Sequence, residues 1–216
     1  MSNGESTVRL ESSRLVLRKM RRPDLEEMER WRPFSDPLRT LWNIPRSGSL
    51  SRDLWFALHN SDPTTLWFAV ERREDKRVIG SVSLREIMGH TSARLGVSFG
   101  SDYVDQGYGT EALGLFLPYY FGTLCFQRLV LDVAATNKRA IQVYRKLGFR
   151  QTGEHYRNIP EQVDLDFLQR DEYRDLWPYF RRRVGRMQLL FCDMVLEGRE
   201  WSRRQAASDQ PVTAAA

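Results

Sequence analysis

The feature that most constrains this fold is a change of pattern near the middle of the chain. Three apolar runs of strand length, 66–71, 78–86 and 93–99, follow one another with short turns between them, which predicts an antiparallel meander. A turn carrying Gly107 and Gly109 comes next and leads into a helical run. This change predicts that a β-turn-α-β unit continues the sheet. The chain is therefore expected to form one mixed α/β domain with extensions, which its 216 residues accommodate.

Ordinary propensity signals predict the other elements. Pro23 is tolerated in a first helical turn and opens a short helix. Leucines at four-residue spacing predict a helix over 49–60. Asn137 and Gly148 are a typical N-cap and C-terminal stop, and they bound a helix over 137–147. Strands are expected over 15–20, over 128–133 and from Phe149 onward, with a loop over 32–48.

Composition excludes several classes of protein. No window approaches the roughly 20 apolar residues of a membrane span, and the start of the chain lacks a signal-peptide pattern, so we expect a soluble, cytoplasmic protein. Cys125 and Cys192 are far apart and lie in apolar runs, which favours core packing over a disulfide. The histidines do not cluster at metal-ligand spacing, so we expect no bound metal. They are His59, His90 and His155.

Positive charge is concentrated near the C-terminus. The net charge is +5, and the segment 174–204 holds eight arginines against four acidic residues. A solvated helix face explains such a stretch more simply than a nucleic-acid site, so a nucleic-acid partner is not expected. The flanking segments 1–13 and 205–216 are expected to be a flexible N-terminus and a disordered tail.

The same C-terminal segment carries apolar residues at intervals of three, four or seven positions. This spacing predicts a helical extension over 174–204. The stripe is expected to pack on its own domain, and a homodimer contact or a wall of the substrate groove is the alternative. Its members are Leu176, Phe180, Val184, Met187, Phe191, Met194 and Trp201.

The glycine turn suggests anion binding. Glycines where a strand ends and a helix begins let backbone amides converge on an anion, with the positive end of the helix dipole behind them. A phosphate group would suit this arrangement. An ordinary tight turn explains Gly107 and Gly109 equally well when they are taken alone.

Two longer runs carry a family resemblance. Residues 96–113 (GVSFGSDYVDQGYGTEAL) and 137–149 (NKRAIQVYRKLGF) resemble, in order and spacing, the GNAT superfamily of acyl-CoA-dependent N-acetyltransferases. Residues 14–18, 163–168 and 171–173 resemble the branch that contains the ribosomal-protein alanine N-acetyltransferases. The resemblance implies a GNAT domain over 14–173. Its sheet would be mixed, mostly antiparallel and twisted, flanked by helices, with a splayed central strand pair.

The resemblance also implies a site for acetyl-CoA as co-substrate. Tyr144 would donate a proton to the departing sulfur, and Asn137 would contact pantetheine. A helix N-cap explains Asn137 without any ligand, and core packing is the alternative for Tyr144. The other residues expected to bind the cofactor are the strand residues Val97, Ser98 and Phe99 and the loop residues Val104, Gln106, Gly107, Tyr108, Gly109 and Thr110.

Several positions depart from the family pattern. Arg94 stands where relatives often carry an acid, so the general base is assigned first to Glu86 and second to His90. Asp105 places a negative charge in the glycine loop, which predicts weaker CoA binding. Pro118 removes a backbone donor inside a helix, so we expect a bend near 114–118.

The predicted activity is acetyl transfer to a primary amine by direct transfer in a ternary complex. A peptide or protein α-amino group is the leading acceptor, and a polyamine, an amino acid or an aminoglycoside is the alternative. The acceptor loops 32–48 and 86–92 do not identify the substrate. A CoA-binding module with little turnover is the rival function, because the strand acid is missing and the glycine loop is altered.

Overall fold

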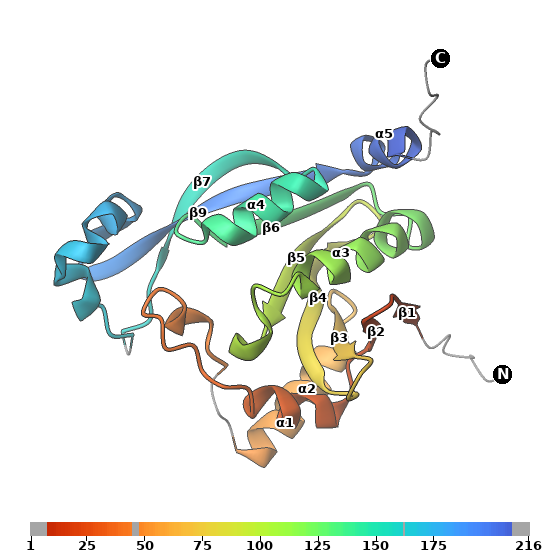
Figure 1. Ribbon diagram of the computed structural model, residues 1–216, viewed down its shortest axis with the longest axis horizontal. Helices are drawn as coiled ribbons and strands as arrows, with labels where there is room; N and C mark the ends of the chain where they lie inside the picture. Colours follow the sequence, from red (N-terminus) through yellow and green to blue (C-terminus); the bar gives the residue numbers. More distant parts are fainter. Residues whose placement is uncertain (1–7, 45–47, 162, 209–216) are drawn as a thin grey trace.

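A computed structural model describes residues 8–44, 48–161 and 163–208, and Figure 1 shows its arrangement. Within these residues one nine-stranded sheet runs through the molecule in the order β1-β2-β3-β4-β5-β6-β9-β7, with β8 paired to β9. The strands are β1 (Arg9–Glu11), β2 (Leu15–Lys19), β3 (Leu66–Arg72), β4 (Val78–Met88), β5 (Ser92–Phe99), β6 (Arg128–Ala134), β7 (Arg150–Asn158), β8 (Phe180–Arg183) and β9 (Arg186–Glu197). The helices are α1 (Arg22–Glu29), α2 (Ser49–Ser61), α3 (Tyr108–Pro118), α4 (Lys138–Leu147) and α5 (Gly198–Ser208).

The predicted fold class is confirmed, including the splayed strand pair. Every pairing in the sheet is antiparallel except that of β5 with β6. These two strands pair only at Ser92 with Arg128, Ala93 with Leu129 and Arg94 with Val130. Both strands then continue, and the ribbons of β5 and β6 move apart in Figure 1. The sheet therefore consists of two halves joined at one end of β5 and β6.

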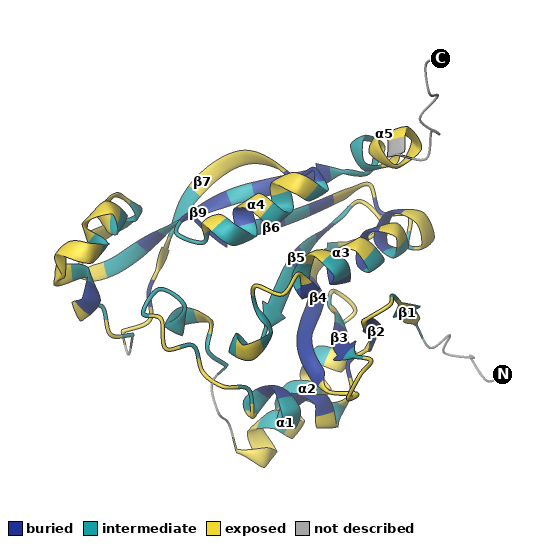
Figure 2. Cartoon of the chain, viewed as in Figure 1, coloured by how far each residue is buried: buried dark blue, intermediate teal, exposed yellow. Residues whose placement is uncertain are grey.

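Helices cover the two faces of the sheet unequally. Phe68 and Val70 of β3 belong to the main core, which includes Phe116 of α3 and Ile141 of α4. Ala69, between them in sequence, belongs to a second cluster with residues of α1 and α2. Because side chains alternate across a strand, α3 and α4 lie on one face and α1 and α2 on the other. Figure 2 shows the buried residues concentrated in the strands between these layers.

The helix that follows the glycine turn changes its type at Pro118. Regular α3 ends at this residue, and a π-helical turn, Tyr119–Thr123, follows it. The N–H of Leu124 donates to the carbonyl of Tyr119 at 2.9 Å, which is the wider π spacing. Pro118 has no N–H to donate to the carbonyl of Gly114, but the irregular turn follows Pro118, and the expected bend near 114–118 stays a prediction.

The predicted C-terminal helix is wrong over most of its length. Residues 180–197 form the hairpin β8–β9, and β9 lies between β6 and β7 in the sheet. The residues at three- and four-residue spacing are only some members of an almost continuous apolar run, 189–196. Such a run is typical of a buried strand. Val184 and Gly185, both with positive φ, form the hairpin turn. Within 174–204, helix occurs only in the 3-10 helix Asp171–Tyr179, which precedes β8, and in α5.

Most of the apolar stripe nevertheless packs on its own chain, although Val184 is 94% exposed. Phe191 and Met194 are buried in the sheet, and Trp201 of α5 stacks on Phe121 with ring centroids 5.4 Å apart. The homodimer contact stays a prediction. The leucines that predicted α2 lie instead on its exposed side, where Leu50 is 80% and Leu54 is 60% exposed.

Smaller corrections concern the ends and the cysteines. Residues 9–11 form β1, and residues 205–208 belong to α5, so these parts of the two end segments are regular structure instead of flexible chain. The remainder of both segments, 1–7 and 209–216, lies outside the described residues. Cys192 is buried as expected, whereas Cys125 is exposed at a positive φ. Among the described helices, none is long and apolar enough to cross a membrane.

Candidate functional site

The parted strands leave one edge of β5 open. Beyond Arg94, the described part of the chain places no strand against β5 on its β6 side, while β4 pairs with its other side up to Phe99. Val97, Ser98 and Phe99 all lie on this stretch, as predicted. Their backbone N–H and C=O groups on the open side are therefore available to an extended ligand that carries amides.

The glycine loop lies directly beyond this open edge. Gly107 is the N-cap of α3 with φ +81°, a left-handed conformation that disfavours other residues, and Tyr108 begins the helix. A Cβ on Gly109 would lie 3.6 Å from the ring of Phe99, so the helix start packs against the end of β5. The free amides of the first turn of α3 therefore lie beside the open strand. The predicted loop residues Val104, Gln106 and Thr110 belong to the same segment.

Arginines from outside the loop supply positive charge beside it. Arg14 donates from Nη1 to the carbonyl of Gln106 at 3.2 Å, and its guanidinium lies 4.6 Å from the ring centroid of Tyr108. Arg14 also forms an ion pair with Glu111 in the first turn of α3. Arg14, which precedes β2, thus places a guanidinium group beside the glycine loop.

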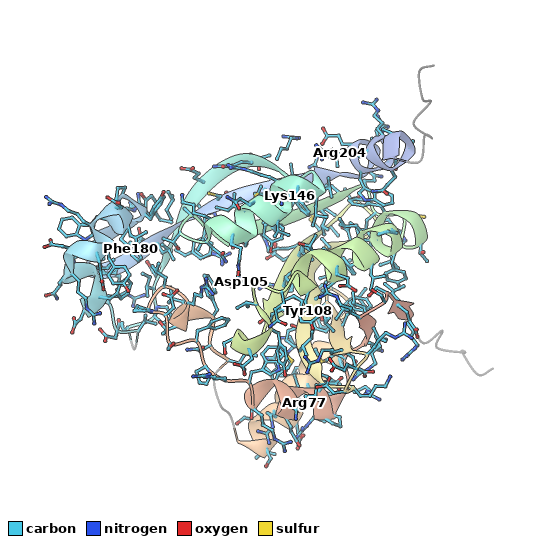
Figure 3. The ribbon with its side chains drawn as sticks, viewed as in Figure 1. Arg77, Asp105, Tyr108, Lys146, Phe180 and Arg204 are labelled. Carbon is cyan, nitrogen blue, oxygen red and sulfur yellow. The ribbon has the colours of Figure 1, made fainter. Side chains whose placement is uncertain are left out.

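The negative charge of Asp105 is paired. Arg139 Nη1 of α4 lies 2.5 Å from Asp105 Oδ1, and Arg39 Nη1 lies 3.6 Å from Asp105 Oδ2. The hydrogen bond from Arg139 lowers the pKa of Asp105. Figure 3 shows Asp105 between α4 and the start of α3. This carboxylate therefore links the two helix starts, and two guanidinium groups offset the charge that the sequence alone predicted to weaken an anion site.

Helix α4 presents both of its predicted site residues near the opening. Asn137 Oδ1 accepts the N–H of Ala140 at 3.1 Å, so the capping interpretation is confirmed. Among the described residues, none accepts a hydrogen bond from its Nδ2. Tyr144 packs edge-on against Phe149 with ring centroids 5.6 Å apart. Burial, and secondly the negative charge of Asp132, raise the pKa of Tyr144 to about 12. Its phenol is therefore protonated at neutral pH and is available as an acid.

Asp132 is a functional candidate that the sequence analysis missed. It lies on β6 just beyond the last pair with β5, and its side chain is only 5% exposed. Arg94 Nη1 lies 2.9 Å from Asp132 Oδ1, and Arg157 Nη2 of β7 lies 2.7 Å from Oδ2. The sequence did carry a signal for this residue, since it is an acid inside the apolar strand run 128–134. An acid that is buried in a strand needs a partner for its charge.

Arg157 also lines a pocket of about 720 Å³. Its walls come from the loop 35–43, from residues 157–160 and 163–170 and from β9. Ala134, Leu189 and Phe191 belong to the cluster beneath it, whereas Val133 and Cys192 belong to the main core on the other face. The pocket therefore lies on the face of the sheet opposite α3 and α4. Residues within 35–43 of the expected acceptor loop 32–48 line this pocket, whereas no residue of 86–92 is among its lining residues; the acceptor role of both loops stays a prediction.

A second, smaller pocket connects this region with the end of β5. Trp42 and Asn43 line both pockets, and the smaller one also touches Phe99 and Gly100. An extended ligand beside β5 and a molecule in the larger pocket would therefore approach each other from opposite faces of the sheet.

Comparison with known proteins decides the family. The model of the GNAT acetyltransferase domain matches residues 14–150, which is more than half of the chain. The chain belongs to the GNAT acetyltransferases. It is an acetyl-CoA-dependent N-acetyltransferase.

Two of the three relatives reported below are spermidine N-acetyltransferases by name. The spermidine N(1)-acetyltransferase of Escherichia coli K12 is 30% identical over 139 residues, which cover 64% of this chain and 74% of the relative. The N-acetyltransferase YoaA of Bacillus subtilis is 23% identical over 150 residues, covering 67% and 84%. The solved spermidine N-acetyltransferase of Vibrio cholerae, in complex with CoA and spermine, superposes with a TM-score of 0.65 at 22% identity, covering 88% and 99%. The GNAT prediction is confirmed, whereas none of these three names points to the ribosomal-protein alanine branch, which stays a prediction.

The two bases predicted for this acetyltransferase lie in different places. Glu86 occupies the bulge of β4 at a positive φ, and its Oε2 accepts from Arg94 Nε at 2.9 Å. It thereby joins the Arg94–Asp132 network, although its side chain is 64% exposed. His90 lies in the turn before β5, with Nδ1 3.0 Å from the carbonyl of Leu124. That turn is at the end where β5 and β6 are paired, so His90 is remote from their opening.

His155 is a further group that the sequence analysis treated as isolated. Its Nδ1 lies 3.0 Å from Asp193 Oδ1 of β9. Its ring stacks on Phe191, which lines the larger pocket, with ring centroids 5.8 Å apart. The expectation of a helix over 174–204 placed Asp193 in the wrong kind of element, which concealed the pair. Within the described residues no group of three or more potential ligands could hold a metal ion, and the absence of a metal stays a prediction.

Proposed function

We propose that this acetyltransferase binds acetyl-CoA along the open edge of β5 and transfers its acetyl group directly to a primary amine held in the larger pocket. One observation carries the proposal: β5 and β6 separate after Arg94, with the glycine loop and Tyr144 on one face and the pocket on the other. A ternary complex follows from this arrangement, because each substrate has its own side of the sheet.

The residues beside β5 fit the chemistry of acetyl-CoA. The open backbone edge at 97–99 suits the amides of pantetheine, and the amides of 104–110 with Arg14 and Arg139 suit a diphosphate. The carboxamide nitrogen of Asn137 remains available to a ligand carbonyl. The bound thioester supplies the acyl group. An N–H of the open β5 edge would polarise its carbonyl oxygen.

Tyr144 is proposed to hold the proton that the leaving sulfur needs. Burial keeps its Oη protonated, and Asp132 strengthens this effect, because an anion beside a phenol opposes its ionisation. A thiol has a pKa of roughly 8.5, so its thiolate is already a fair leaving group. Tyr144 therefore accelerates the step without being indispensable.

The acceptor amine must lose a proton, and His155 is proposed to accept it. Imidazole is the commonest general base in enzymes, and a carboxylate on one ring nitrogen leaves the other free to accept a proton. His155 has such a partner in Asp193 and stacks on a wall residue of the pocket. Glu86, already held by Arg94, is the alternative.

The pH dependence of the rate separates these two bases. For His155→Gln we expect kcat/KM to fall about 100-fold near neutral pH and to recover as the pH rises, because the amine then loses its proton to water. Glu86→Gln is the matched control at the other candidate and should retain the wild-type profile. The opposite pattern would assign the base to Glu86.

The activity itself is tested by thiol release from acetyl-CoA. The full chain is assayed against peptides with free α-amino groups, amino acids, an aminoglycoside and spermidine, with mass spectrometry of the products and calorimetry of acetyl-CoA binding. Release of thiol with stoichiometric N-acetylation of an amine is the expected result. Acetyl-CoA binding without acetylation of any amine would instead show a CoA-binding module.

A further inference from the structure

We infer that the acceptor is a small primary amine with a single positive charge on an apolar body. This inference rests on the proposed function and names the substrate class of the same site. Its basis is the lining of the larger pocket, which is dominated by apolar side chains. The aromatic ones are Trp42, Phe167 and Phe191, and Leu41, Ile159 and Leu189 are aliphatic.

The pocket has the size and rigidity of a small-molecule site. A volume of about 720 Å³ lies within the range of roughly 300 to 1,000 Å³ that is usual for such ligands. Phe167, Leu189 and Phe191 are buried in the fold, so these walls are already formed. Trp42 meets Phe191 edge-on, with ring centroids 6.3 Å apart, and adds an aromatic surface from the opposite side. An aromatic or branched aliphatic group would bury apolar area here.

The charges of the pocket disfavour a polyamine. Among the described lining residues Asp164 is the only carboxylate, and Arg157 and Arg170 are cationic. Asp164 already accepts the N–H of Asp166 at 2.8 Å. A second or third ammonium group would therefore meet guanidinium groups or apolar walls without a carboxylate of its own, which costs binding energy.

The acidic residues near the pocket do not offset the positive charge of its lining. Asp132 lies behind Arg157 and is shared with Arg94, so one carboxylate serves two guanidinium groups. The guanidinium of Arg157 also lies 4.6 Å from the ring centroid of Phe191, which fixes it against the wall. Glu172 is 3.6 Å from Arg170 Nη1, but both side chains are more than 60% exposed, so the pairing is weak.

Three probes test the inference in the full chain: phenylethylamine, ethanolamine and spermidine. They differ in apolar body and in number of charges, and kcat/KM is measured by thiol release with identification of the product. We expect phenylethylamine to exceed both of the others by at least about tenfold. A higher value for spermidine or for ethanolamine would overturn the inference while leaving the proposed function intact. If no acceptor is acetylated although acetyl-CoA binds, the proposed function itself fails.

Charge reversal in the wall provides a second test that does not disturb the core. Arg170→Glu adds a carboxylate at an exposed wall position, and Arg174→Glu makes the same change outside the lining residues. We expect Arg170→Glu to raise the spermidine to phenylethylamine ratio of kcat/KM by about fivefold. The Arg174 variant should keep the wild-type ratio. Equal ratios in wild type and Arg170→Glu, or equal shifts in both variants, would show that this pocket does not select the acceptor.

Discussion

At the scale of single residues, the proposed acid catalysis depends on keeping the phenol of Tyr144 protonated. Tyr144 has a pKa raised to about 12 because it is buried and lies near the charge of Asp132. A group with a raised pKa loses its proton only as the pH approaches that value. Tyr144 therefore remains an acid throughout the range in which an amine acceptor becomes neutral, and any loss of rate below pH 10 has another origin.

Replacement of this phenol gives the first prediction. Tyr144→Phe should lower kcat by about 10- to 100-fold with little change in the KM for either substrate, because only the proton donor is removed. Tyr119→Phe is the matched control, since Tyr119 is also a tyrosine with a raised pKa due to burial, but it packs on Phe68. Steady-state kinetics check both variants. Equal kcat in wild type and Tyr144→Phe would exclude the proton-donor role.

The second prediction concerns Asp105. Its carboxylate engages Arg139 and Arg39, and the diphosphate of CoA would compete with it for the same guanidinium groups. Asp105→Asn should therefore lower the KM for acetyl-CoA by about threefold, the scale of an exposed ion pair. Asp102→Asn, an exposed change in the preceding turn, is the control. An increase of KM on replacing Asp105 would mean that the loop needs this carboxylate for its own structure.

At the scale of elements, the sequence predicts those whose signals are local. Helix α4 has its Asn137 cap and its Gly148 stop where propensity places them, and the strands β3 to β5 follow the predicted meander. The glycine loop and Tyr144 were predicted because each lies in a continuous run, 96–113 or 137–149, that resembles the family. Asp132 and His155 were not, because their partners Arg157 and Asp193 lie on other strands and depend on the sheet order.

β9 was predicted as part of a helix, and the turn between β8 and β9 supplies the third prediction. Val184 is 94% exposed at φ +48°, a conformation that is costly for a β-branched residue. Val184→Asn should raise the free energy of unfolding by about 1 kcal/mol, because Asn-Gly suits a two-residue hairpin turn. Val184→Thr keeps the branching and should give no gain. Urea denaturation measures both, and equal stabilities for the two variants would refute this account of the turn.

At the scale of the whole molecule, the sheet is two halves with a narrow connection. Strands β1 to β5 form one half and β6, β9 and β7 the other, and three residue pairs of β5 and β6 join them. Beyond these pairs, Asp105 with Arg139 and Arg94 with Asp132 also connect the halves through side chains. A ligand inserted along the open edge would therefore connect elements from both halves.

The fourth prediction follows from this connection. Acetyl-CoA at 100 times its Kd should stabilise the fold by about 2.7 kcal/mol and raise Tm by roughly 5 to 10 °C. Hydrogen exchange should slow in β5, in the glycine loop and at the start of α4, because the proposed ligand contacts lie there. Dephospho-acetyl-CoA, which retains the thioester and the diphosphate, is expected to protect the same segments. Protection confined to the larger pocket would place the cofactor on the other face of the sheet and would contradict the proposed division of the two substrates.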